Sequence, residues 1–344
     1  MDVTRGIAVL GMVTAHVGVI GPDFWTATGW LAVVNGRSAA TFAVLAGVSL
    51  ALLSGGPRPV TGPPLSRVRV RVGARALLLL VLGLVLTGLG TPVAVILPSY
   101  AAYFLLVLPV VRARPAALVG AAATVALVGP PACFAIADAL AGNDGPYALA
   151  AELLVTGYYP AGIWMAYVLT GLAVGRFDLT GTGVRQLLLS AGPCLAVVGY
   201  AGSALAVRLA AGASPDVLRL LTTEPHADTT FEVVGNTGVA LGVLGLALVV
   251  ADRWPRWVYP VAATGALALS VYSLQIVAIA ALGDGVVRRP DVGVHLLFLG
   301  VSLAAASAWR AWLGRGPLER VLHGLSTGAA DLVTGRTTKV PPVA

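Results

Sequence analysis

Two histidines are the residues of this chain best suited to acid–base or acyl-transfer chemistry. His16 lies near the end of the first apolar run, about 16 Å along a helix from Arg5. His226 lies in the polar stretch Glu224-Pro-His226-Ala-Asp228, which Glu232 follows. A histidine with carboxylates nearby is typical of a base and its orienting partner. We therefore predict His16, His226 and Glu232 as catalytic residues.

Both histidines also fit roles without chemistry. A neutral His16 inside an apolar helix can simply hydrogen-bond a neighbouring helix. The stretch around His226 is also typical of a solvated loop that leads into a helix. In that interpretation Asp228 or Thr229 is the N-cap, and Glu232 lies in the first helical turn.

Arg37 is a fourth catalytic candidate. It follows Asn35 at the start of the second apolar run, and a short loop separates it from the first run. Arg37 and His16 could then face each other, and a guanidinium there suits an anionic group or a developing oxyanion. Its alternative role is to anchor the helix by extending its charge to the membrane surface.

Other polar residues are predicted to line a substrate pocket. Asp2 and Arg5 are spaced to pair on the first turn of a helix. Tyr272 and Gln275 form a polar patch with Ser270 in a late apolar run, although such patches can also only bridge helices. The predicted pocket residues are Asp2, Asn35, Asn236, Tyr272 and Gln275.

The sequence offers no metal or redox motif. It contains no phosphate-binding loop of the Gly-x-x-x-x-Gly-Lys type, no His-Glu-x-x-His and no Cys-x-x-Cys. Cys133 and Cys194 lie in separate apolar runs, where small packing residues are the simplest interpretation. We expect no metal site and no permanently bound cofactor.

The elements that must position these residues are membrane helices. Of the 344 residues, 58% are hydrophobic and 11% are charged, less than half the usual charged fraction of a soluble domain. Apolar runs of spanning length fall near residues 4–20, 38–54, 74–90, 92–111, 116–136, 160–176, 186–211, 232–251, 258–282 and 292–313. We predict an all-α, polytopic transmembrane bundle of about ten helices.

Charge predicts the orientation of this bundle. With the N-terminus inside, the cytoplasmic segments hold all but five of the 22 Lys and Arg residues. Those five are Arg37, Arg208, Arg219, Arg288 and Arg289. We therefore expect both termini in the cytoplasm, a plasma-membrane location and contact with the lipid bilayer. The net charge of +7 follows from this bias and does not indicate a nucleic-acid partner.

The chain divides into a bundle and a tail. We predict a transmembrane bundle over residues 1–313, with halves at 1–136 and 160–313, and a cytoplasmic tail over 314–344. Leu318, Val321 and Leu325 have the spacing of a short helix on the membrane surface, and the end of the tail is expected to be disordered. Gly171-x-x-x-Gly175 and Gly238-x-x-x-Gly242 are typical of close helix packing.

Two parts of the sequence resemble known families. The block Asp2-Val-Thr-Arg5-Gly6, the apolar run that ends at His16, and the segment from Gly36 to Leu50 resemble the first two helices of the heparan-α-glucosaminide N-acetyltransferase-like membrane family. The segment Gly265–Gln275 and the closing Arg315-Gly-Pro-Leu-Glu319 resemble the bacterial domain-of-unknown-function family 418.

The first resemblance implies acyl transfer across the membrane. Acetyl-CoA would be a co-substrate that enters from the cytosol, its phosphates held by Arg5, Arg71 and Arg75. A histidine would act as base or transient acyl carrier toward an amine or hydroxyl of an envelope glycan or lipid. The loop over residues 17–35, where the acetyltransferases carry their proposed catalytic histidine, contains none here.

Two other functions remain open from the sequence. Gly- and Pro-interrupted apolar segments with few buried polar groups also allow a small-molecule or lipid transporter. A membrane scaffold without a small-molecule site is the third possibility.

Overall fold

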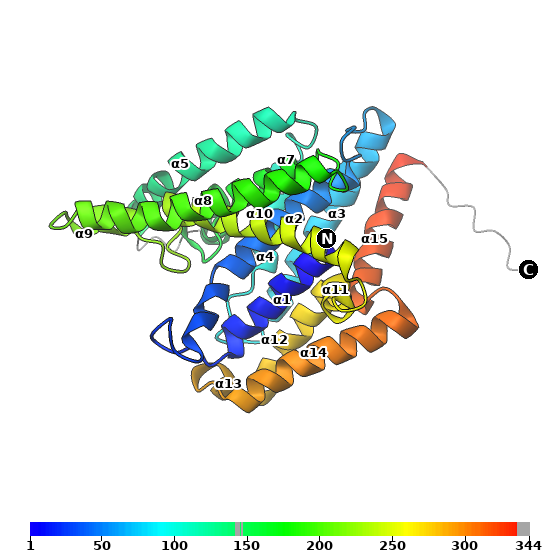
Figure 1. Cartoon of the computed structure of the whole chain (residues 1–344). Helices are drawn as coiled ribbons and strands as arrows, with labels where there is room; N and C mark the ends of the chain where they lie inside the picture. Colours follow the sequence, from blue (N-terminus) through cyan, green and yellow to red (C-terminus); the bar gives the residue numbers. More distant parts are fainter. Residues whose placement is uncertain (142–144, 146, 336–344) are drawn as a thin grey trace, which may run out of the picture.

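In the computed structural model, which describes residues 1–141, 145 and 147–335, the regular elements of those residues are all helical (Figure 1). The predicted all-α fold is confirmed. The main helices are α1 (Asp2–Val17), α2 (Arg37–Leu53), α3 (Pro63–Thr87), α4 (Leu97–Val107), α5 (Pro115–Leu140), α7 (Ala161–Val174), α8 (Thr182–Leu209), α10 (Thr230–Arg253), α11 (Tyr259–Ala266), α12 (Ala268–Leu282), α14 (Val292–Leu313) and α15 (Pro317–Thr334). The short elements are η1 (Gly29–Val34), α6 (Ala148–Ala151), η2 (Glu152–Thr156), α9 (Pro215–Leu221) and α13 (Gly285–Arg288).

The helices define a multi-pass membrane protein. Within the described residues, six are long and apolar enough to cross a bilayer: η1 with α2, then α3, α5, α8, α10 and α14. Helices α11 and α12 meet this test only as a pair. Each predicted apolar run coincides with a helix, but the count of ten crossings and the cytoplasmic termini remain predictions.

Four predicted spans differ from the helices observed. The runs at 4–20 and 160–176 contain α1 and α7, of 16 and 14 residues, which are shorter than a typical span. In the run at 92–111 only the eleven residues of α4 are helical, about 17 Å of helix, because Pro98 lies at the start of that helix. The run at 258–282 is bent by 80° between α11 and α12. The first amide groups of α12 bond to the carboxylate of Glu319 instead of continuing the helix of α11.

Glycines allow the central helices to touch. A Cβ built on Gly171 would lie 1.8 Å from the carbonyl oxygen of Val44, so α7 and α2 are in backbone contact. Gly238 meets the backbone of Ala196 in the same way, which joins α10 to α8. The predicted close packing at both glycine motifs is confirmed.

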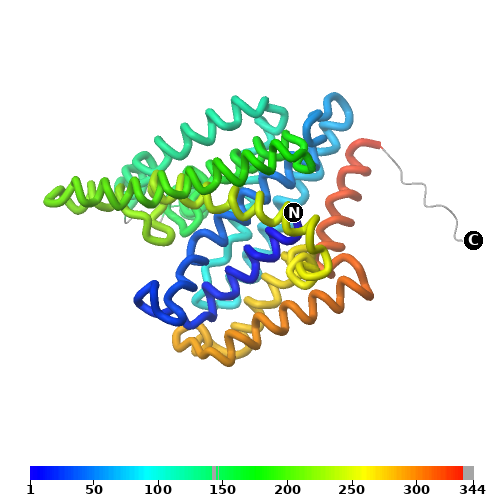
Figure 2. The backbone as a smooth tube through the Cα atoms, in the orientation of Figure 1, coloured from blue at the N-terminus to red at the C-terminus, as the bar shows by residue number. Residues whose placement is uncertain are grey.

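Helix α15 packs along the first half of α3 (Figures 1 and 2). Arg67 of α3 forms an ion pair with Asp331. Val321, Leu325 and Leu332 of α15 are exposed, as expected for a helix lying on a membrane surface. The predicted disordered end of the tail lies outside the described residues.

Candidate functional site

Helix α1 connects two cavities. The first, about 400 Å³, we call the basic cavity because four arginines line it: Arg5, Arg75, Arg310 and Arg315, with His323 and the acids Asp2 and Glu319. The second, about 310 Å³, we call the histidine cavity because His16 and His226 both line it. Met12 lines both cavities and is itself only 5% exposed. The two cavities therefore have one buried wall residue of α1 in common.

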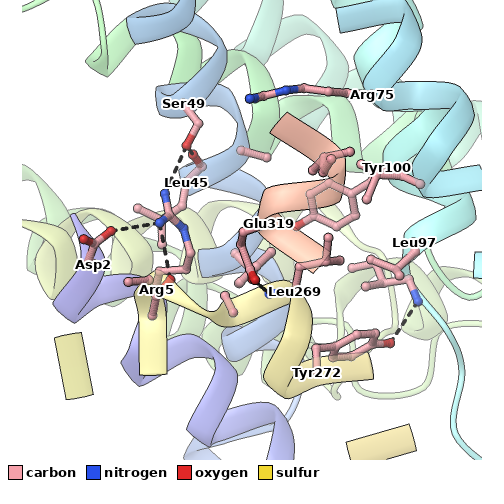
Figure 3. Close-up of a pocket in the computed structure, with 18 of the residues that line it drawn as sticks. Asp2, Arg5, Leu45, Ser49, Arg75, Leu97, Tyr100, Leu269, Tyr272 and Glu319 are labelled. Carbon is pink, nitrogen blue, oxygen red and sulfur yellow. Dashed lines mark hydrogen bonds and ion pairs between the residues drawn. The ribbon is translucent and has the colours of Figure 1, made fainter. Parts of the chain in front are cut away.

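Asp2 and Arg5 form the predicted pair on one wall of the basic cavity. The Arg5 guanidinium donates to Asp2 Oδ1 at 2.9 Å and to Ser49 Oγ of α2 at 3.3 Å (Figure 3). It also donates to the carbonyl of Gly265 at 3.4 Å, at the end of α11. Arg5 thus ties three helices together beside the cavity.

The other cations come from α3, from the last turn of α14 and from the α14–α15 connection. Arg75 points into the basic cavity and its Nε reaches Ser326 Oγ at 3.4 Å (Figure 3). Within the described part of the chain, the guanidinium groups of Arg310 and Arg315 line the cavity without a protein hydrogen bond or ion pair. Arg71, one turn before Arg75, bonds His323 Nδ1 at 3.1 Å.

The surplus of positive charge affects His323. Burial and the nearby Arg315, Arg71 and Arg75 lower its pKa, so the imidazole is neutral at physiological pH. A site that neutralises its own histidine in this way favours an anionic ligand.

The closing Arg-Gly-Pro-Leu-Glu motif has a structural explanation. Glu319 accepts hydrogen bonds from the amides of Leu269 and Ser270 at 2.8 and 3.1 Å, and from Ser270 Oγ at 2.6 Å. Its carboxylate therefore occupies the N-terminus of α12, where the helix dipole is positive. Tyr272, one turn further on, lines the same cavity and its hydroxyl accepts from the amide of Ile96 at 3.3 Å.

His16 is held by Gln275 of α12. The amide nitrogen of Gln275 lies 2.9 Å from His16 Nδ1. Because that amide group only donates, His16 carries its proton on Nε2 in this arrangement. Nε2 makes no hydrogen bond within the described chain, and the ring lines the histidine cavity.

His226 is fixed by its loop and by aromatic rings. Its backbone has φ +62°, an uncommon left-handed conformation for a residue other than glycine. The ring lies against Tyr158 at 4.2 Å between centroids, tilted by 39°, and 6.0 Å from the nearly parallel ring of Trp164. Burial lowers the pKa of His226 to about 4, so this histidine is neutral at pH 7.

Glu232 holds the backbone of this loop. One carboxylate oxygen accepts from the amide of His226 at 2.9 Å and the other from the amide of Asp228 at 2.7 Å. Thr229 caps α10 by accepting from the amide of Glu232, which is the predicted capping role. Glu232 therefore acts on His226 through the main chain.

Arg37 and Asn236 belong to a network behind the loop. Arg37 Nε donates to Tyr200 OH at 2.8 Å, and that hydroxyl donates to Asn236 Oδ1 at 2.6 Å. Asn236 in turn donates to Glu232 at 3.2 Å. The structure thus pairs Arg37 with Tyr200 of α8 and His16 with Gln275, while Asn35 lines the histidine cavity.

Sequence reasoning did not identify several residues of the two cavities. Met12 lacked any polar signal, and Tyr158 and Trp164 were not tied to His226. The dipeptide Tyr158-Tyr159 directly before Pro160 carries no signal of its own, because tyrosines are common at the ends of membrane spans. Arg315 stands out in the sequence only through the Arg-Gly-Pro-Leu-Glu motif, and Arg310 only as a cytoplasmic cation of the predicted topology.

Comparison with protein families agrees with the sequence resemblances. Residues 1–205 match the family model described as heparan-alpha-glucosaminide N-acetyltransferase, catalytic, and residues 190–329 match the family described as protein of unknown function (DUF418). The first match covers more than half of the chain, so the protein belongs to the heparan-alpha-glucosaminide N-acetyltransferase catalytic family, a family of membrane acyltransferase-like proteins. No curated protein and no solved structure gives a significant match.

Proposed function

We propose that this protein transfers an acyl group, acetyl in the simplest case, from a cytosolic acyl-CoA to an amine or hydroxyl acceptor of the cell envelope, with the plasma membrane as its location. The observation that carries the proposal is that Met12 lines both the basic cavity and the histidine cavity. A thioester entering from the basic side would reach the histidines by passing this one side chain.

The basic cavity suits an acyl-CoA. Arg75, Arg310 and Arg315 supply positive charge for the phosphates of the nucleotide. The same cavity also has an apolar lining, with Leu45, Leu79 and Leu97 among its residues, as an uncharged arm of the donor requires. Its volume of about 400 Å³ lies within the usual range for small-molecule sites, roughly 300–1,000 Å³.

The two histidines suit complementary roles in the transfer. A neutral His226, with its Nδ1 unpaired within the described chain, is the base that takes the proton from the acceptor nitrogen or oxygen. The acceptor atom then bonds to the thioester carbon while His16 Nε2–H donates to the carbonyl oxygen. The carbon–sulfur bond breaks, and the proton passes from His226 to the CoA thiolate.

A transporter is the second candidate function, and the broken helix pair α11–α12 is the observation behind it. Half-helices in a membrane commonly aim the positive end of their dipole at an anionic substrate. Here the carboxylate of Glu319 already occupies that end of α12. This occupancy argues for acyl transfer over transport.

Binding and transfer of radiolabelled acetyl-CoA by the purified protein test the proposal. We expect saturable binding that Arg315→Gln weakens, and acetyl transfer to amine or hydroxyl acceptors that His16→Ala and His226→Ala abolish. His295→Ala is the matched control, because His295 is a buried histidine that bonds Thr14 instead of lining either cavity. Absence of acetyl-CoA binding, together with CoA-independent uptake of a solute by proteoliposomes, would replace acyl transfer by transport.

A further inference from the structure

The hydroxyl of Tyr100 is an unpaired polar group in the basic cavity. Tyr100 belongs to α4, is 3% exposed and lines the cavity. Within the described residues its hydroxyl has no hydrogen-bond partner. Its ring points from α4 toward the space between Glu319 and Leu269 (Figure 3). Phe42 and Phe104 pack edge-on against this ring and fix its direction.

Two neighbouring tyrosines have hydrogen-bond partners for their hydroxyls, whereas Tyr100 has none within the described residues. Tyr103, on the same helix, donates to the carbonyl of Tyr159 at 2.8 Å. Tyr272, across the cavity, accepts from the amide of Ile96. A buried hydroxyl without a partner is costly, and buried polar groups in native proteins are almost always paired. A ligand that supplies the missing acceptor accounts for the arrangement.

We propose that the Tyr100 hydroxyl donates a hydrogen bond to an amide carbonyl in the pantetheine arm of the acyl donor. The pantetheine arm is uncharged and carries two amide groups, so in an apolar channel it needs hydrogen-bond partners that are not cations. Tyr100 lies on the apolar part of the lining, beside Leu97 and Phe104, whereas the arginines supply the charge. This inference rests on the proposed function and adds the residue that recognises the arm.

Binding of two ligands to the full-length protein separates the roles of Tyr100 and the arginines. One ligand is CoA, and the other is adenosine 3′,5′-bisphosphate, which keeps phosphates but lacks the arm. We expect Tyr100→Phe to weaken CoA binding roughly 2- to 12-fold, the worth of one net hydrogen bond, and to leave the bisphosphate unchanged. Arg75→Gln should weaken both ligands.

Tyr103→Phe is the matched control. It removes a hydroxyl of the same helix, but one that already donates a hydrogen bond within the protein. It should leave CoA affinity unchanged in the folded protein. Equal CoA affinity of wild type and Tyr100→Phe would overturn the inference while leaving the proposed function intact. Equal losses for CoA and the bisphosphate, or an equal loss in Tyr103→Phe, would also overturn it, since the effect would then be structural. If the wild type binds neither ligand, the proposed function itself fails.

Discussion

The carboxylate of Glu232 accepts the backbone amide of His226 at 2.9 Å, so a residue in the first turn of α10 sets the place of an imidazole six positions earlier. The same carboxylate accepts the amide of Asp228. Both loop residues have positive φ, which residues other than glycine seldom adopt without such support. The position of His226 in its cavity therefore depends on Glu232.

Replacing Glu232 by Gln tests this dependence. The amide side chain keeps one acceptor oxygen, so one of the two buried backbone amides loses its partner at a cost of about 1–3 kcal/mol. We expect a lower unfolding temperature in detergent and an acyl-transfer rate reduced roughly 10- to 100-fold, because His226 is displaced. Glu224→Gln in the same loop is the control, since Glu224 is exposed. Transfer at the wild-type rate in Glu232→Gln would separate Glu232 from catalysis.

The pH profile of transfer should carry the signature of His226. Burial lowers its pKa to about 4, below the ordinary value of about 6.5. Since the neutral form is the base, activity is present above the lowered pKa and is lost as the pH falls through it. We expect kcat/KM to stay level from about pH 7 to about pH 5 and to fall by half near pH 4.

The control for this profile is His323→Gln, which removes a histidine of the basic cavity and should keep the acid limb in place. His226→Gln should remove the base and leave only residual transfer. An acid limb centred near pH 6.5 would assign the base to an imidazole in water and contradict the role of His226.

The sequence predicted the helices and local pairs well, because these depend on near neighbours. The apolar runs, the Asp2–Arg5 pair and the Thr229 cap each involve residues within one or two turns. The sequence did not predict hydrogen bonds between residues that are far apart in the chain. Nothing in the local pattern links His16 to Gln275, which is 259 positions away, or Glu319 to the start of α12.

The same limit explains the bent pair α11–α12. Residues 258–282 are mostly apolar, carry no charge and contain no proline near Leu267, so they favour one straight span. The break depends on the carboxylate of Glu319, which satisfies the first amides of α12 from a different helix. A hydropathy pattern does not reveal that a carboxylate from another helix replaces the backbone acceptors of these amides.

A glycine contact next to the basic cavity gives a test of the packing there. A Cβ built on Gly265 would lie 1.8 Å from the carbonyl oxygen of Asp2, so Gly265→Ala forces α11 away from α1. We expect a loss of about 1–3 kcal/mol in unfolding free energy. Acetyl-CoA binding should also weaken, because Arg5 donates to the carbonyl of Gly265.

Gly300→Ala on α14 is the matched control, because a Cβ there meets open space. Alanine in a helix interior is favoured over glycine by about 1 kcal/mol, so this variant should be as stable as the wild type or more stable. Equal stability of the two variants would mean that α1 and α11 do not touch as described.

Met12 offers the most direct test of a passage between the cavities. If the acyl group passes from one cavity to the other at Met12, the larger ring in Met12→Trp should block that passage and leave the arginines of the basic cavity in place. We expect acetyl-CoA affinity to change by no more than about threefold while transfer falls roughly 100-fold, since the thioester no longer meets the histidines. Met12→Leu, a swap that roughly conserves volume, should keep both activities. Size-exclusion chromatography in detergent checks that both variants fold, and transfer by Met12→Trp at the wild-type rate would show that the acyl group takes another path.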